Sequence, residues 1–184
     1  MTERLNEIAR ALRETQLDGW LFYDFRLSDP LAYRILGLSA DGIATRRWFC
    51  FVPAHGQSRA IVSAVEADRL DALAAEKIVY RSHDEMIAAL RTALGGARRI
   101  AMDYSPGCAI PYVSRVDAGT VEIVRAMGVE VVTAADLIQH FEATLTREQL
   151  ASHHRAARAL RSIVDETFAE IGRLISAGRP VSEV

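Results

Sequence analysis

Carboxylates at the ends of two expected strands are the first residues in this 184-residue chain that could do chemistry. Asp24 follows the apolar run that begins at Trp20, and Asp103 follows a second apolar run. Carboxylates at neighbouring strand ends could share Mg²⁺, with Glu66 as a third ligand, and would then support a metal-dependent nuclease. The alternative interpretation is that Asp24 starts a turn and that Asp103 accepts hydrogen bonds from loop amides.

The histidines and cysteines form no recognised catalytic or metal-binding motif. The sequence has no HExxH, no Cys/His cluster and no G-x-S-x-G elbow. His153 and His154 would point about 100° apart on a helix, which makes them poor ligands for one metal ion. Cys50 lies in an apolar run and is expected to be buried, whereas Cys108 is expected to be a half-buried structural thiol. His83 is expected to be exposed at a helix start.

The composition is that of an ordinary soluble globular protein. Half of the residues are hydrophobic and 25% are charged, so a core can form without disulfides. The 22 Lys and Arg residues are scattered among 24 Asp and Glu residues, which excludes the basic surface of a typical nucleic-acid binder. The first residues of the chain are charged and do not resemble a signal peptide. No apolar stretch is close to the length of about 18 residues that a membrane span requires. We therefore expect a cytoplasmic protein with no nucleic-acid or membrane partner.

Strand and helix signals alternate through residues 1–144. Apolar runs bounded by turn residues predict strands, and apolar residues at three- to four-residue spacing predict helices. Strands are expected at 20–23, 47–52, 59–62, 77–81, 99–104 and 129–133. Helices are expected at 3–15, 30–37, 63–75, 82–94, 117–128 and 134–143. The second and third strands are close enough for an antiparallel hairpin, so we expect an α/β fold with a six-stranded mixed sheet flanked by helices.

Several of these helices carry capping signals. Asp29 precedes a proline that suits the first helical position, and Gly37 follows the last helical residue of that segment. The segments 63–66, 82–85 and 146–149 each have the spacing of a capping box. These signals set the expected starts of three further helices.

The last 40 residues have a different pattern. From Thr146 to Ala177, apolar residues recur at three- to four-residue steps, which predicts one helix of about 30 residues and roughly 45 Å. Gly178 and Pro180 end it. So long an amphipathic helix needs an apolar partner, and the final residues, 181–184, have the character of a lead-in to another element.

The order of these elements resembles the start of the creatinase/prolidase/aminopeptidase P metallopeptidases. The stretch DGWLFYDFRLSDPLAYRILGL is similar to the family's first strand and helix, with Tyr33–Gly37 as a loose counterpart of a Tyr-Leu-Thr-Gly-like segment. RRWFCFVPAHGQSRAIVSAVEADRL is similar to its hairpin, and RRIAMDYSP to a later strand. The segment from Thr146 onward is similar to the opening of the catalytic domain, through Glu148, Ala156-Ala157, Gly178 and Glu183.

The resemblance implies the rest of the architecture. Residues 1–144 would be the family's ribonuclease H-like N-terminal domain, and residues 145–184 the first helix and lead-in of a pita-bread catalytic domain. Two divalent metal ions, manganese or cobalt, would be held by two Asp, one His and two Glu beyond residue 184. Such enzymes cleave before proline or hydrolyse creatine, form homo-oligomers, and use the N-terminal domain to close over an active site. This segment would then be non-catalytic and inactive alone.

The resemblance also implies which loops face the substrate. These are the loop after the first strand and the loop before the hairpin. Arg46 or Arg47, in the second loop, could bind a peptide carboxylate as a bidentate fork. An aspartate of the first loop could contact a substrate amine. Tyr33 could line the pocket. The alternative for each is surface charge or core packing. The candidate residues are Asp24, Arg26, Asp29, Tyr33, Arg46 and Arg47.

A different class of function remains open from the sequence. The chain could be a stand-alone binding module that dimerises through the helix from Thr146 to Ala177 and has no peptidase activity. A metal-dependent nuclease is the third alternative.

Overall fold

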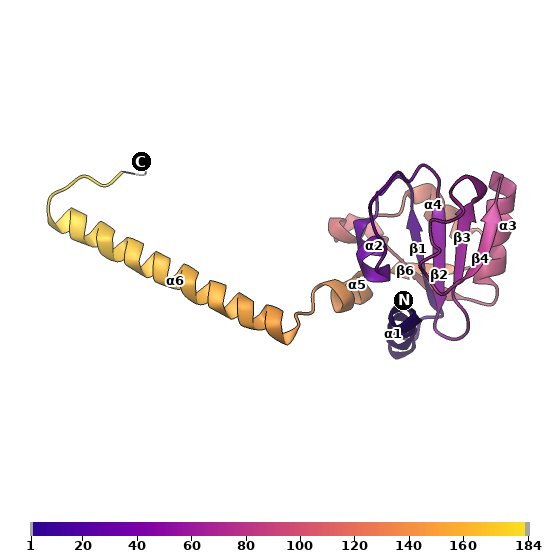
Figure 1. Cartoon of the computed structure of the whole chain (residues 1–184), viewed down its shortest axis with the longest axis horizontal. Helices are drawn as coiled ribbons and strands as arrows, with labels where there is room; N and C mark the ends of the chain where they lie inside the picture. The colour runs from indigo at the N-terminus through magenta and orange to yellow at the C-terminus, as the bar shows by residue number, and fades with distance from the viewer. Residues whose placement is uncertain (1, 183–184) are drawn as a thin grey trace. The chain divides into compact units, whose positions relative to one another are not determined.

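The structure of the protein, a computed structural model, describes residues 2–182. It consists of two units, Met1–Ala143 and Thr144–Val184. The first unit contains a sheet covered by helices, and the second contains one long helix (Figure 1).

The first unit is built on a six-stranded sheet with the strand order β4-β3-β2-β1-β5-β6. β2 pairs antiparallel with β1 and β3, whereas the other pairs are parallel. The predicted mixed sheet and hairpin are therefore confirmed. Because β2 alone among these six runs in reverse, the other five strands end at the edge where β2 begins. The strands are β1 (Gly19–Asp24), β2 (Trp48–Pro53), β3 (Arg59–Ser63), β4 (Glu76–Tyr80), β5 (Arg99–Met102) and β6 (Glu130–Thr133).

Helices cover both faces of the sheet. Side chains alternate across a strand, so β1 sends Trp20 and Phe22 to one face and Leu21 and Tyr23 to the other. The first face packs against α1 (Thr2–Glu14), α2 (Pro30–Leu36) and α5 (Ala135–Glu142). The second packs against α3 (His83–Leu94) and α4 (Ala118–Arg125).

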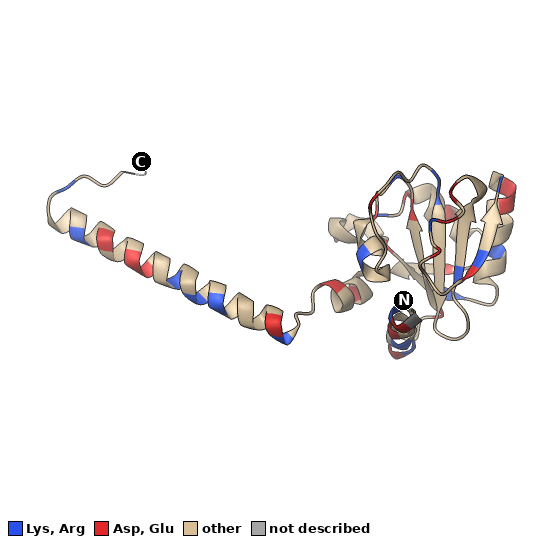
Figure 2. Ribbon diagram, viewed as in Figure 1, with Lys and Arg blue, Asp and Glu red and all other residues tan. Residues whose placement is uncertain are grey.

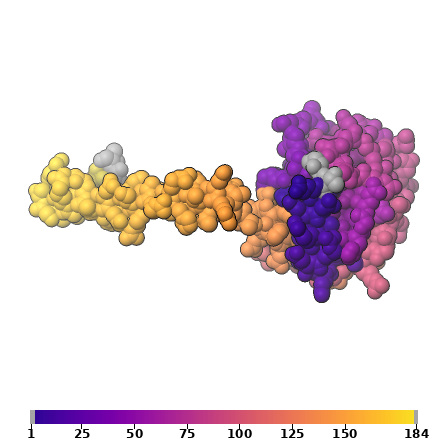
Figure 3. Space-filling model, turned by 60° about the horizontal axis from the view of Figure 1, so that its bottom comes forward, coloured from indigo at the N-terminus to yellow at the C-terminus, as the bar shows by residue number. Residues whose placement is uncertain are grey.

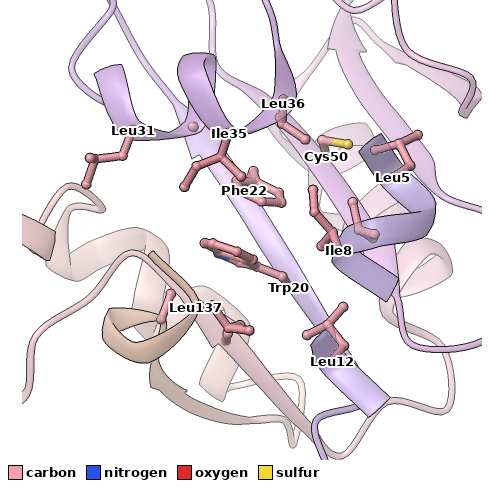
Figure 4. Close-up of a cluster of buried hydrophobic side chains, with 14 of the residues drawn as sticks. Leu5, Ile8, Leu12, Trp20, Phe22, Leu31, Ile35, Leu36, Cys50 and Leu137 are labelled. Atoms are coloured by element: carbon pink, nitrogen blue, oxygen red, sulfur yellow. The ribbon is translucent and has the colours of Figure 1, made fainter. Parts of the chain in front are cut away.

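The larger core shows how amphipathic helices close the first face. Figure 4 shows Leu5, Ile8 and Leu12 of α1 directed toward Trp20 and Phe22, whose rings stack with centroids 4.3 Å apart. α1 and α5 are neighbours on this face (Figure 3), and the Arg4 guanidinium lies 4.8 Å from the ring centroid of Phe141. These contacts confirm the amphipathic helix expected at the start of the chain.

The predicted helix caps have the geometry that their residue types favour. The Asp29 carboxylate accepts hydrogen bonds from the backbone amides of Leu31 and Ala32 at the start of α2. Gly37 ends that helix with φ 68°, a left-handed conformation that a side chain would disfavour. Ser82 caps α3 and Asp117 caps α4 in the same way, through bonds from Glu85 N and Thr120 N.

The prediction of a helix over residues 63–75 is wrong. Only a short 3₁₀ turn, η1 (Ala64–Glu66), forms there, and turns follow. Ser63 does accept a bond from Val65 N, but the Glu66 carboxylate binds residues of another loop instead of completing a capping box.

The predicted half-burial of Cys108 is also wrong, because its side chain is exposed at the end of the turn η2 (Pro106–Cys108). Cys50 is buried as expected, and burial raises the pKa of its thiol to about 12.

The second unit is the 30-residue helix α6 (Arg147–Ser176). Its capping box is complete: Gln149 N donates to Thr146 Oγ1 and Thr146 N donates to Gln149 Oε1. No side chain of α6 is buried. A basic block from Arg155 to Arg161 precedes an acidic block from Asp165 to Glu170 along the helix (Figure 2). Within residues 2–182, no helix is long and apolar enough to cross a membrane.

Candidate functional site

The loops at one edge of the sheet form the candidate site. β1, β3, β4 and β5 end at this edge and β2 begins there, so segments distant in sequence meet (Figure 1). We call this the carboxyl edge. It comprises the loops 25–29, 38–47, 81–82 and 103–117 and the first part of the segment 64–75, which runs from the end of β3 back to the start of β4.

Exposed apolar side chains gather on the carboxyl edge. Among residues 2–143, every large hydrophobic side chain that is exposed lies on these loops, with the exception of Val79 in β4. Ile43 is 81% exposed and Tyr112 is 79% exposed. An apolar surface of this kind is typical of a site for a ligand or a protein partner. The apolar residues of the edge are Phe25, Ile43, Val65, Ile110 and Tyr112.

A groove of about 700 Å³ lies within the carboxyl edge. Arginine side chains and aromatic rings line it together, so it offers both charge and apolar contact to a ligand. Its lining residues include Tyr23, Phe25, Arg46, Arg47, Tyr80, Arg81, His83 and Asp117.

Hydrogen bonds hold the phenol groups of the groove in place. Burial raises the pKa of Tyr23, and its hydrogen bond to Asp117 raises it further. The Tyr80 hydroxyl donates to the backbone carbonyl of Arg47 at 2.7 Å, and burial raises the pKa of Tyr80 as well. Both tyrosines are therefore neutral donors at physiological pH, and the positive charge of the groove comes from its arginines.

Glu66 fixes the loop that carries two of those arginines. Its Oε1 accepts bonds from Thr45 N at 2.8 Å and Thr45 Oγ1 at 2.6 Å, and its Oε2 accepts from Arg46 N at 3.3 Å. Burial acts to raise the pKa of Glu66, but these bonds outweigh it and the pKa is lowered. Arg46 turns back onto its own loop, where Nη1 donates to Thr45 O at 3.1 Å, whereas Arg47 is half-buried beside the tyrosines.

Asp24 is the centre of a buried network behind the groove. Its Oδ2 accepts from Leu27 N at 3.1 Å and from the Tyr33 hydroxyl at 2.9 Å, while its Oδ1 accepts from Asp29 N at 3.0 Å and Ser28 Oγ at 3.4 Å. Four donors therefore satisfy this carboxylate inside the fold. The network holds the β1–α2 loop in a tight conformation.

Tyr33 extends this network toward other elements. Its hydroxyl also accepts from Trp48 Nε1 at 3.0 Å and from Arg69 Nη2 at 2.9 Å. Burial raises the pKa of Tyr33, although the bonds from Arg69 and Trp48 act in the opposite direction. The ring is only 2% exposed, so Tyr33 joins α2, β2 and the 64–75 segment rather than lining an open pocket as predicted.

The sequence-predicted candidates thus separate into two groups. Asp24 and Asp29 are fully buried, so neither presents an oxygen to solvent where a substrate amine could meet it. Arg26 is exposed on the β1–α2 loop with φ 62°, and Arg46 and Arg47 lie on the groove. A direct role in substrate binding stays a prediction for these three arginines.

Sequence reasoning missed most of the groove. Tyr23, Tyr80, Arg81, His83 and Asp117 belong to it, although His83 is exposed as expected. Each lies at a strand end or a helix start, and that position was the available signal. What the sequence alone did not reveal is that these ends meet at one edge.

The carboxylates proposed for a shared Mg²⁺ do not form that site. Among the described residues, no three His, Cys, Asp or Glu side chains are grouped so that they could hold a metal ion. Glu66 binds the 38–47 loop, and Asp24 is satisfied by four donors. Asp103 accepts a bond from Trp20 Nε1 at 2.9 Å rather than from loop amides. This arrangement does not fit the nuclease alternative.

Comparison with solved structures shows which known fold this is. The chain matches a dipeptidase from Pyrococcus horikoshii OT3 with a TM-score of 0.60 at 18% identity, covering 90% of this chain and 44% of that chain. It matches the prolidase from Pyrococcus horikoshii OT3 with a TM-score of 0.55 at 14% identity, covering 82% and 38%. It matches the creatinase/prolidase N-terminal domain of an X-Pro dipeptidase from Streptococcus pyogenes with a TM-score of 0.56 at 16% identity, covering 76% and 99%.

These matches define the fold and the extent of the similarity. The chain has the fold of the creatinase/prolidase N-terminal domain, as its sequence pattern predicted. It spans less than half of the two Pyrococcus chains but nearly all of the isolated Streptococcus domain. No protein-family model matches the sequence, and no curated protein matches it.

Proposed function

We propose that this chain is the non-catalytic N-terminal domain of an Xaa-Pro dipeptidase-like metallopeptidase, and that its carboxyl edge forms one wall of the substrate pocket. The observation that carries the proposal is the gathering of exposed apolar side chains and arginines on that edge. The fold shared with Xaa-Pro dipeptidase domains supports it.

The chemistry of the groove suits a peptide that ends in a proline. A proline ring has no charge and would pack against Phe25 or Tyr23, and the terminal carboxylate would pair with Arg47. An arginine fork binds a carboxylate through two parallel hydrogen bonds, which fixes its orientation. The groove therefore offers recognition of the substrate, and a separate domain would supply the hydrolytic chemistry.

The proposal extends to what lies outside this chain. Two divalent metal ions, manganese or cobalt, would belong to a domain encoded after residue 184, with α6 as its first helix. The codons that follow Val184 are expected to specify two Asp, one His and two Glu in family order. A reading frame without those ligands would remove the peptidase assignment. We also propose that the protein is cytoplasmic and acts as a homo-oligomer.

Binding by the chain itself can be measured directly. The ¹⁵N-labelled chain is titrated with Ala-Pro and, as a control, with Ala-Pro amide, which lacks the carboxylate. Ala-Pro is expected to shift the amide signals of residues 45–47 and 81–83, and Arg47→Gln to weaken this binding at least several-fold. Arg98→Gln, an exposed change at the opposite edge, should leave it unaltered. Equal shifts with both ligands, or Xaa-Pro cleavage by this chain with Mn²⁺, would contradict the proposal.

A stand-alone dimerising module is the second candidate function. The observation that favours it is the apolar stripe of α6, in which Leu160 is 64% exposed and Phe168 is 69% exposed. Under this alternative, residues 2–143 would bind a ligand and α6 would join two copies. Two observations together would favour this alternative over the first proposal. The codons after Val184 would lack the metal ligands, and the chain would self-associate through α6.

A further inference from the structure

Two aspartates lie side by side in the core behind the carboxyl edge. Asp29 ends the β1–α2 loop and Asp103 directly follows β5, so the pair joins two segments that are far apart in sequence. Asp29 is 0% exposed and Asp103 is 1% exposed. The two carboxyl groups lie close enough to interact directly.

One oxygen of each carboxyl group already has its partners. Asp29 Oδ1 accepts from Leu31 N and Ala32 N, both at 3.1 Å, and Asp103 Oδ1 accepts from Trp20 Nε1 at 2.9 Å. Among the described residues, no N–H or O–H group donates to Asp29 Oδ2 or Asp103 Oδ2. A buried oxygen without a donor is costly, and two adjacent carboxylates repel each other. A proton held between the two Oδ2 atoms removes both penalties.

We propose that Asp29 and Asp103 share a single proton at neutral pH, and that this proton locks the β1–α2 loop onto β5. The inference does not depend on the proposed function, because it concerns the folded chain alone. It adds a protonation-sensitive contact to the loop of the carboxyl edge that carries Arg26.

The charged surroundings of the pair favour the protonated state. Burial raises the pKa of both carboxyl groups, and the neighbouring Asp29 raises that of Asp103 further. Asp24, on the β1 side, adds negative charge that raises the pKa of Asp29. The bond from Trp20 and the positive charge of Arg115, in the segment before α4, act in the opposite direction on Asp103. The net direction for the pKa of Asp103 is well above the usual range of an aspartate.

The sign of the pH dependence follows from this direction. A group whose pKa is higher in the folded state than in the unfolded state stabilises the fold at low pH, and that stability is lost as pH rises through the folded pKa. Above about pH 5 the unfolded aspartates are ionised, so the folded chain holds one proton more. The unfolding equilibrium constant should then rise about tenfold per pH unit until the pair ionises.

Asparagine substitutions test the shared proton with nearly unchanged shape. In Asp103→Asn, the amide oxygen can accept from Trp20 while the NH₂ group donates to Asp29 Oδ2. In Asp29→Asn, the oxygen can still cap α2 and the NH₂ group donates to Asp103 Oδ2. Each single variant supplies a permanent donor where the wild type holds a proton. The double variant places two NH₂ groups against each other.

The measurement is urea unfolding of the 184-residue chain from pH 5 to pH 9. The wild type should lose stability with rising pH, and each single variant should lose this dependence. The double variant should be less stable than both. Asp136→Asn, an exposed aspartate of α5, is the matched control and should keep the wild-type slope. A wild-type slope that persists in both single variants, or a double variant as stable as the singles, would overturn the proposal.

A second readout needs no variant. Carboxyl ¹³C signals of the wild-type chain report the protonation of each aspartate during a pH titration. One proton should remain on the Asp29–Asp103 pair at pH 7. If both carboxyl groups are fully ionised at pH 7, no proton is shared and the proposal is wrong.

Discussion

Helices α1 and α6 have the same kind of amphipathic sequence but opposite burial. In α1, Ile8 and Leu12 are 0% exposed, because the sheet lies beneath them. In α6, Leu160 and Phe168 are largely exposed, and no side chain of the helix is buried. The periodicity of a helix depends on residues three and four positions apart, whereas the burial of its apolar face depends on segments that are distant in sequence. An apolar stripe therefore identifies a helix but not the partner that buries it.

The largest expected effect comes from applying one substitution to both regions. Phe22→Ala removes a fully buried ring that stacks on Trp20, so it should cost about 3–5 kcal/mol of unfolding free energy. Phe168→Ala removes an exposed ring of α6 and should cost no more than about 0.5 kcal/mol. Urea unfolding followed by circular dichroism measures both, and the fluorescence of Trp20 and Trp48 reports the first core separately. Equal costs would mean that α6 is buried in solution.

Self-association of α6 is the next effect in size. Arg155, Arg158 and Arg161 precede Asp165, Glu166 and Glu170 along the helix, so an antiparallel pair would bring opposite charges together. We expect the 184-residue chain to self-associate, as measured by sedimentation equilibrium. Leu160→Lys should weaken this association at least tenfold, because burying a leucine contributes about 1.5–3 kcal/mol.

The matched control for this prediction lies on the opposite side of the helix. Ala169 is about half a turn away from the apolar stripe, so Ala169→Lys adds the same charge without removing apolar contact. It should leave the association unchanged. A chain that stays monomeric at all accessible concentrations would refute the role of the stripe.

The smallest effect concerns the loop that Glu66 holds. Glu66→Ala removes the acceptor for Thr45 and Arg46, so their amides should exchange hydrogen faster, with a loss of about 1 kcal/mol or less. Because the pKa of Glu66 is lowered, the wild-type loop should loosen in the same way as pH falls below about 4. Glu122→Ala, an exposed change in α4, is the control. Unchanged exchange at Thr45 would show that the loop is held by other contacts.

The elements that the sequence predicted well are those with local causes. Asp29 and Gly37 bound α2 as expected, and the Thr146–Gln149 box forms in full. The 63–66 segment carries a similar signal but forms only a 3₁₀ turn, because Glu66 finds partners in the 38–47 loop. A capping motif indicates which local hydrogen bonds are possible. It does not indicate whether a distant segment competes for the same side chain.

The candidate site was predicted less completely for the same reason. Arg46 and Arg47 could be assigned to the loop before β2 because they precede a recognisable hairpin, and both line the groove. The contacts of Asp29 with Asp103, of Tyr33 with Arg69 and of Arg47 with Tyr80 each join segments far apart in the chain. Residue types and local spacing do not specify such pairs. They follow from the strand order, which brings the ends of distant strands to one edge.

The strand order also has a consequence for the speed of folding. β1, β2 and β3 pair with close neighbours in sequence, whereas β1 pairs with β5 only after a long intervening segment. Closing that long loop costs more conformational entropy, and this loss comes before the contacts that compensate for it have formed. We therefore expect the β1–β2–β3 meander to form early. β5 and β6 should dock late, when the Asp18 carboxylate can accept bonds from Arg98 N and Arg99 N.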